Sequence, residues 1–319
     1  MSKQKEWVEQ PGALNKRDMI IRQIVFNAIL IIVCLIVLYP VLWVIMMAIT
    51  PNEIAGVSSS LIPQQVTFDN FIDVVSRVDD YGNHLFLHQL KNSVLVAAIT
   101  TALGVLLACT AAYGFSRLNF VGRQLGLQAF LVTQMFPGVV MTIPLYILLG
   151  KLGLLNSIVG LVLVYSVSAL PFCVWNLKGY FDTIPKELEE AAIVDGASRI
   201  RIFVTIVLPL ARPAIAITAL FSFMTAWNEF ILAATLMNSE LAYTLPVALK
   251  QYVGAQSVQY GLFAAGAIIV SVPIMALFFA LQKHLVGGLT AGGVKGSRQQ
   301  NVHGVFRRNS RAKRRISQK

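Results

Sequence analysis

The sequence has few charged residues for its length. Of 319 residues only 13% are Asp, Glu, Lys or Arg, whereas 56% are hydrophobic. Soluble domains carry about 25% charged residues, so this composition excludes a soluble globular protein and indicates one that crosses a membrane several times. Cysteine is also scarce. The three cysteines, Cys34, Cys109 and Cys173, all lie inside apolar runs, which excludes a disulfide framework.

Motifs for catalysis and nucleotide binding are missing as well. The glycine-rich stretch 288–295 has the outline of a phosphate-binding loop, but Val294 separates its last glycine from Lys295, and glycine rather than Ser or Thr follows the lysine. No segment outside the apolar runs is long enough to hold an ATPase domain. We therefore expect no catalytic residue, no metal site and no cofactor bound by this chain.

Basic residues outnumber acidic ones, 26 to 15, but their placement argues against a nucleic-acid partner. Eight of the 26 basic residues lie in the last 23 positions. Most of the others flank apolar runs, as membrane orientation requires. We expect this chain to contact membrane lipid and no nucleic acid.

The apolar residues are gathered into runs long enough to cross a bilayer, which takes about 20 residues per helix. Six runs qualify, at approximately 24–48, 93–116, 125–149, 157–177, 212–236 and 260–282. About 20 polar residues precede the first run and no small-residue cleavage site follows it, so we expect an uncleaved span. The predicted fold is an all-α polytopic membrane protein with six transmembrane helices.

The charges that flank these runs predict the orientation. The N-terminal segment is basic, whereas the segment 51–90 has five acidic residues and only Arg77 as a strong base. Basic residues return before the third run and again between residues 178 and 212. Because basic flanks stay on the cytoplasmic side, both termini and the segment 182–212 are predicted to be cytoplasmic.

The segment from Asp182 to Arg212 is the most patterned stretch between two spans. A helix-start signal at Thr183 and Pro185 precedes three glutamates, which favour the first turns of a helix. Gly196 can adopt positive φ and predicts a sharp turn that ends this helix. A second short helix follows, and Leu208-Pro209 is expected to close it.

This spacing resembles the EAA loop of binding-protein-dependent ABC importer permeases, over residues 182–209. The residues that match are Glu190, Ala191, Ala192, Asp195, Gly196, Ile206, Leu208 and Pro209. The resemblance implies a type I importer fold and a coupling helix that sits in a cleft of a cytoplasmic ATPase dimer. It also implies a second permease subunit as a heterodimeric partner, an extracytoplasmic sugar-binding protein, and ATP and Mg²⁺ bound by the ATPase.

The C-terminal string LTAGGVKG extends the resemblance to the maltose and oligosaccharide branch of carbohydrate-uptake permeases. In that branch such a tail enters the ATPase interface, which implies contacts by Thr290, Gly292, Gly293 and Lys295. The segment 66–71 also resembles these permeases, where a short helix packs over the pore mouth. Unlike them, this chain adds a basic, acid-free tail at 297–319, which we expect to be disordered and to have affinity for anionic headgroups.

The spans contain features typical of a transport path. Five prolines predict kinks, at Pro40, Pro137, Pro144, Pro171 and Pro273, and small residues predict close packing of the run 93–116. A carboxylate inside a span is a functional candidate by default, and Glu229 lies in the run Trp-Asn-Glu-Phe that resembles carbohydrate permeases. Gln134 and Asn228 are further candidates for a substrate path or gate. For Glu229 we favour a gating or bracing role over sugar contact.

We therefore expect a multi-pass subunit of the bacterial inner membrane. Its predicted parts are a cytoplasmic segment 1–22, a permease domain 23–296 and the tail 297–319. The expected cargo is a maltose-type di- or oligosaccharide, and the alternatives are another small solute, such as glycerol phosphate or a polyol, and ion-coupled secondary transport. An ion-coupled transporter needs more charged residues within its spans than Glu229 alone.

Overall fold

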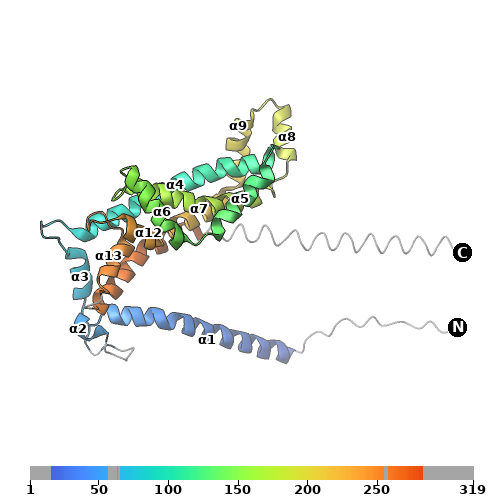
Figure 1. The fold of residues 1–319 in the computed structure, drawn as a ribbon. Helices are drawn as coiled ribbons and strands as arrows, with labels where there is room; N and C mark the ends of the chain where they lie inside the picture. The colour runs from blue at the N-terminus through green and yellow to red at the C-terminus, as the bar shows by residue number, and fades with distance from the viewer. Residues whose placement is uncertain (1–15, 57–62, 64, 255–257, 283–319) are drawn as a thin grey trace, which may run out of the picture. The chain divides into compact units, whose positions relative to one another are not determined.

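The computed structural model describes residues 16–56, 63, 65–254 and 258–282. These residues are helical almost throughout (Figure 1). They form two compact units, described separately below: residues 1–71 with 259–268, and residues 72–258 with 269–319. Four helices are long and apolar enough to cross a membrane, and the number rises to six when each of two bent helix pairs counts as one span.

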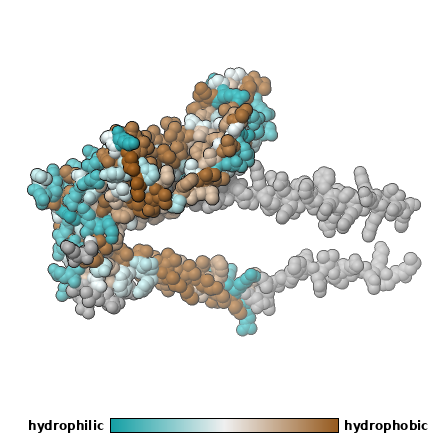
Figure 2. Space-filling model, viewed as in Figure 1, coloured by the Kyte–Doolittle hydropathy of each residue, from teal (hydrophilic) through white to brown (hydrophobic). Residues whose placement is uncertain are grey.

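The first unit is dominated by α1 (Lys16–Ala48), whose side chains are exposed over most of its length within the unit. In Figure 2 this helix is brown along most of its surface, with hydrophilic residues at its N-terminal end. A helix that is apolar all round is typical of a membrane span. The expected span at 24–48 therefore lies entirely within one helix, and Pro40 does not interrupt it.

The C-terminal end of α1 is closed by polar side chains. The buried Asn70, in α3 (Asp69–Ser76), donates its amide to the carbonyl oxygens of Ala48 (2.9 Å) and Thr50 (2.7 Å). Asn52, which begins the short helix α2 (Asn52–Ala55), accepts the backbone N–H of Gly261 at 3.0 Å. A Cβ at Gly261 would lie 2.8 Å from the Asn70 amide nitrogen, so this contact requires glycine.

The second unit is built on three packed helices: α4 (Leu85–Arg117), α7 (Ile158–Phe181) and α11 (Arg212–Asn228). Fully buried small residues on α4, such as Ala108 and Ala112, lie in one of its two core clusters. The predicted close packing of this span is thus confirmed. Hydrophobic residues cover the middle of the unit in Figure 2, and hydrophilic residues gather at its ends.

Two predicted spans are not continuous helices. The run 125–149 forms α5 (Arg123–Met135) and α6 (Gly138–Lys151), which are bent by 98°. In the run 212–236, α11 ends at Asn228, and the chain becomes helical again in α12 (Ile231–Leu236). At the first break Pro137 directly precedes α6. Its missing N–H costs no hydrogen bond there, because the first N–H groups of a helix have no partner within the helix.

The remaining predicted spans match the helices closely. The run 93–116 lies within α4, which begins eight residues earlier than expected, and 157–177 matches α7. The last run is one helix from Tyr260 to Gln282. A short helix, α13 (Leu245–Gln251), lies between α12 and this last span.

Candidate coupling site and substrate path

A helical hairpin follows α7 in the second unit and projects beyond the ends of α4 and α7 (Figure 1). Its first arm is α8 (Glu187–Val194), and the turn that follows this helix contains Gly196, whose φ is +82°. Gly196 N–H donates to the Ile193 carbonyl, and Ala197 N–H donates to the Ala192 carbonyl at 2.9 Å. These two bonds make a Schellman motif, which confirms the predicted glycine turn. An added Cβ at Gly196 would touch nothing within 4 Å, so the backbone angle alone requires glycine.

The second arm of the hairpin consists of consecutive helical segments. It begins with α9 (Arg199–Ile202), passes through a π-helical turn, η1 (Phe203–Val207), and ends with α10 (Leu208–Leu210). The prediction that Leu208-Pro209 closes this helix is confirmed to within two residues. The arm ends at Leu210, and the 78° bend towards α11 comes at Ala211.

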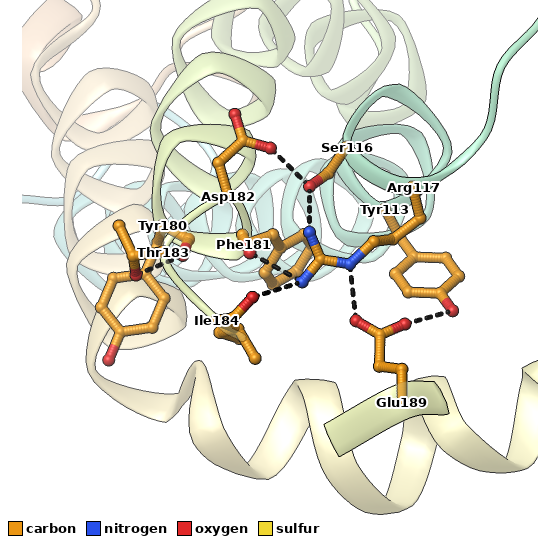
Figure 3. A network of polar contacts seen from close by, with 9 residues as sticks. All are labelled: Tyr113, Ser116, Arg117, Tyr180, Phe181, Asp182, Thr183, Ile184 and Glu189. Atoms are coloured by element: carbon orange, nitrogen blue, oxygen red, sulfur yellow. Dashed lines mark hydrogen bonds and ion pairs between the residues drawn. The ribbon is translucent and has the colours of Figure 1, made fainter. Parts of the chain in front are cut away.

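Arg117, the last residue of α4, fixes the base of the hairpin (Figure 3). Its Nε donates to Glu189 of α8 at 2.5 Å, and both side chains are at most 10% exposed. The same guanidinium donates to the carbonyl oxygens of Phe181 (2.9 Å) and Ile184 (3.0 Å). Tyr113 donates its hydroxyl to the second oxygen of Glu189 at 3.1 Å. One arginine therefore joins the end of α4, the end of α7 and the first turn of α8.

Asp182, immediately after α7, extends this network. Its two carboxylate oxygens accept from Ser116 and from Lys178, each at 2.6 Å. Partial burial acts to raise the pKa of Asp182, but the hydrogen bonds from Lys178 and Ser116, with the charges of Lys178 and Arg117, outweigh it and lower the pKa. The carboxylate therefore stays ionised and holds the two helix ends together.

The hairpin exposes large apolar side chains although it lies outside the spans. Charged side chains such as Glu190 and Arg199 are exposed beside them. The exposed aliphatic residues, which we call its apolar face, are Leu188, Ile193, Val194, Ile200 and Val204. Val194 is 86% exposed and Ile200 77%. An exposed apolar surface of this kind marks a contact for another protein or for a membrane.

The residues of the predicted coupling motif divide between this face and the core. Glu190, Ala191 and Asp195 are exposed, and the Glu190 carboxylate accepts no hydrogen bond within the described residues. Ala192, Ile206 and Leu208 pack instead against the core cluster at the base of the hairpin. The motif thus anchors the hairpin with one side and exposes the other.

Glu229 lies at the break between α11 and α12. Its carboxylate accepts the backbone N–H groups of Leu232 (2.8 Å) and Ala233 (3.0 Å), two donors that the start of α12 leaves unpaired. It also accepts the hydroxyl of Tyr165, on α7, at 2.6 Å. Glu229 therefore caps a broken helix and ties it to a neighbouring span. Its gating or bracing role stays a prediction.

The other two path candidates have exposed side chains, and their role in a path stays a prediction. Gln134, expected to be a buried polar group of its span, is exposed near the break between α5 and α6, and it donates to the Ser168 carbonyl at 3.3 Å. The Asn228 side chain is also exposed. Ser168 and Tyr165 are one helical turn apart on α7. Both span breaks thus meet the same turn of α7, which places two irregular backbone segments at one level of the bundle.

Sequence reasoning missed Arg117, Glu189 and Tyr165. Arg117 was read only as a charge that sets orientation, and Glu189 only as part of an acidic first turn. Their pairing depends on which helix ends meet in space, which no local pattern reports. The predicted ATPase contacts Thr290, Gly292, Gly293 and Lys295, and the tail 297–319, lie outside the described residues.

Comparison with known proteins identifies the family of this chain. Residues 101–290 match the family described as "Binding-protein-dependent transport system inner membrane component". The chain is 36% identical to the galactooligosaccharides transport system permease protein GanQ of Bacillus subtilis over 277 residues, 86% of this chain and 96% of that protein. It is 35% identical to the maltose/maltodextrin transport system permease protein MalG of Yersinia pestis over 273 residues, 82% of this chain and 89% of that one.

A solved structure shares the fold. A chain of a bacterial ABC transporter involved in the import of the acidic polysaccharide alginate superimposes with a TM-score of 0.70 at 23% identity, covering 85% of this chain and 99% of that chain. The predicted all-α importer-permease fold is confirmed by this likeness. The chain belongs to the binding-protein-dependent transport system inner membrane components, the multi-pass permeases of ABC importers.

Proposed function

We propose that this chain is a permease subunit of an ATP-driven importer for a maltose-type di- or oligosaccharide. The observation that carries the proposal is the hairpin 182–210, which has a rigid polar base at Arg117 and an exposed apolar face. A rigid element can transmit the closure of an ATPase dimer to the spans it joins, whereas a floppy loop would absorb it.

The proposed partners follow from this design. The apolar face of the hairpin contacts a cytoplasmic ATPase dimer that binds ATP and Mg²⁺, and a second permease subunit completes the path. An extracytoplasmic binding protein delivers the sugar. A solved relative is in complex with an alginate pentasaccharide-bound periplasmic protein, which supports this arrangement.

The proposed path runs past the two span breaks beside Tyr165 and Ser168. Broken backbone at membrane depth is tolerated where it is buried in protein or lines a water-filled cavity. Gln134 and Asn228 are exposed next to the two breaks, and their amide groups can both donate to and accept from sugar hydroxyls. Glu229 holds the second break without being needed for sugar contact.

The test is uptake into vesicles that contain the purified complex of this chain with its copurifying subunits. Labelled maltose, maltodextrin, galacto-oligosaccharide, trehalose, glycerol phosphate and a polyol are compared, each with its binding protein. We expect ATP-dependent uptake of a di- or oligosaccharide. Uptake of only the polyol or glycerol phosphate would refute the assigned cargo, and uptake driven by an ion gradient without ATP would refute the transport class.

A further inference from the structure

A groove of about 620 Å³ opens on the second unit beside the start of α5. Its polar wall is formed by Arg123, Gln124 and Lys178, and its apolar wall by Phe120, Leu125 and Leu127. Lys178 also pairs with Asp182 at the base of the hairpin, but no residue of the groove belongs to the apolar face of the hairpin or to the turn of α7 at Tyr165 and Ser168. The groove therefore combines cationic and apolar surface outside the two sites described above.

The position of the groove at the ends of spans leads us to expect it at the depth of lipid headgroups. Arg123 begins α5, and Lys178 lies one turn before the end of α7, so both side chains sit where spans leave the hydrocarbon region. This is the end of the bundle predicted to be cytoplasmic. Phe120 is 47% exposed and Leu125 71%, so apolar side chains at this level remain open to a lipid.

The two cations are held in place and keep free donors. Arg123 donates through Nε to the Phe115 carbonyl (2.7 Å) and through Nη1 to Asn119 (3.3 Å), which uses two of its five N–H groups. Lys178 donates one N–H of its ammonium to Asp182. Within the described residues the remaining N–H groups of both side chains have no acceptor. Asp182, the ion-pair partner of Lys178, is not among the residues that line the groove.

From this geometry we propose that the groove binds the phosphodiester headgroup of an anionic phospholipid. Arg123 and Lys178 take the phosphate from two sides, and the apolar wall receives the glycerol and the first acyl carbons. A basic pocket between spans on the cytoplasmic side is a known form of anionic lipid recognition. Because Arg123 is already oriented by Phe115 and Asn119, little side-chain freedom is lost on binding.

The experiment measures lipid binding to the full-length chain, purified with its copurifying subunits, by native mass spectrometry with phosphatidylglycerol and phosphatidylcholine. We expect phosphatidylglycerol to bind more tightly. Each lysine or arginine near a membrane surface contributes about 1 kcal/mol, so Arg123→Gln and Lys178→Gln should each weaken it about fivefold. Arg123→Lys and Lys178→Arg keep the charge and should retain most of the affinity. The matched control is Arg22→Gln, an exposed basic residue of α1 on the same predicted side, which should leave the affinity unchanged.

A second measurement does not depend on the folding of any variant. Phosphatidylglycerol with a photoreactive headgroup should label the peptide that contains residues 118–127 in the wild-type complex. Equal affinity for the two lipids would overturn the proposal, as would an equal loss in Arg22→Gln or labelling confined to other segments. Complete displacement of the lipid by inorganic phosphate at millimolar concentration would assign the groove to free phosphate and overturn the lipid assignment.

Discussion

The ion pair between Arg117 and Glu189 should set the stability of the hairpin base, and Glu189→Gln tests this. The substitution keeps the shape of the side chain but removes its charge, so the guanidinium of Arg117 loses its direct ion-pair partner at a site where both side chains are at most 10% exposed. Removal of one partner from a buried pair destabilises by about 3–5 kcal/mol. Arg117 keeps its bonds to Ser116, Phe181 and Ile184, so we expect the lower end, about 3 kcal/mol.

The assay is hydrogen exchange of the amides of α8 in the full complex. If the hairpin opens locally, a loss of about 3 kcal/mol should speed exchange of these amides about 100-fold, while the amides of α7 should change little. The control is Glu190→Gln, the adjacent exposed glutamate, which should leave exchange unaltered. The double substitution Arg117→Met with Glu189→Met should recover much of the protection, because it strands no charge. Unchanged exchange in Glu189→Gln would refute the assigned role of the pair.

Three further predictions concern the turn, the span break and the topology. Gly196→Val should insert and assemble but lose uptake, because a φ of +82° is strained for valine. The control is Gly179→Val, at an exposed helical glycine with open space around it, and this variant should transport normally. Uptake by Gly196→Val at the wild-type level would contradict the prediction. Glu229→Gln should lower the amount of folded complex and leave sugar affinity intact. If its carbonyl keeps Tyr165 and Ala233, its NH₂ group faces the N–H donor of Leu232. Normal assembly with altered sugar selectivity would show substrate contact instead. In a background without the native cysteines, Asp79→Cys should be labelled from outside and Ser198→Cys should not, and the reverse result would overturn the orientation.

The course of the chain through the membrane could be predicted well, because hydropathy reports it directly. The runs 157–177 and 260–282 match helices within a few residues. The break at Pro137 coincides with one of the predicted proline kinks. The break after Asn228 is not predicted, because hydropathy averaged over the run 212–236 hides one polar pair, Asn228-Glu229. Proline alone does not identify breaks, since Pro144 and Pro171 lie inside unbroken helices.

The site was predictable where a residue's own backbone or burial decides its role. Gly196 follows from the need for positive φ, and the expense of a carboxylate within a span marks Glu229 as a candidate. That Glu229 caps α12 was not predicted. Arg117 acts through partners 64 to 72 positions away, so its role depends on how α4 meets α7 and α8. Such pairings are set by tertiary packing, which a single sequence does not display.

The central claim is that the hairpin 182–210 connects this chain to an ATPase through its apolar face. The most direct measurement is the amount of ATPase subunit that copurifies with Val194→Asn and Ile200→Asn, compared with Val121→Asn, a fully exposed valine in the other loop at the same end of the unit. Burial of one such side chain contributes about 1.5–3 kcal/mol, so each hairpin substitution should weaken the association at least tenfold. We predict loss of the ATPase and of ATP-driven uptake in both hairpin variants, with the Val121→Asn complex intact. Wild-type association in Val194→Asn and Ile200→Asn would contradict the account.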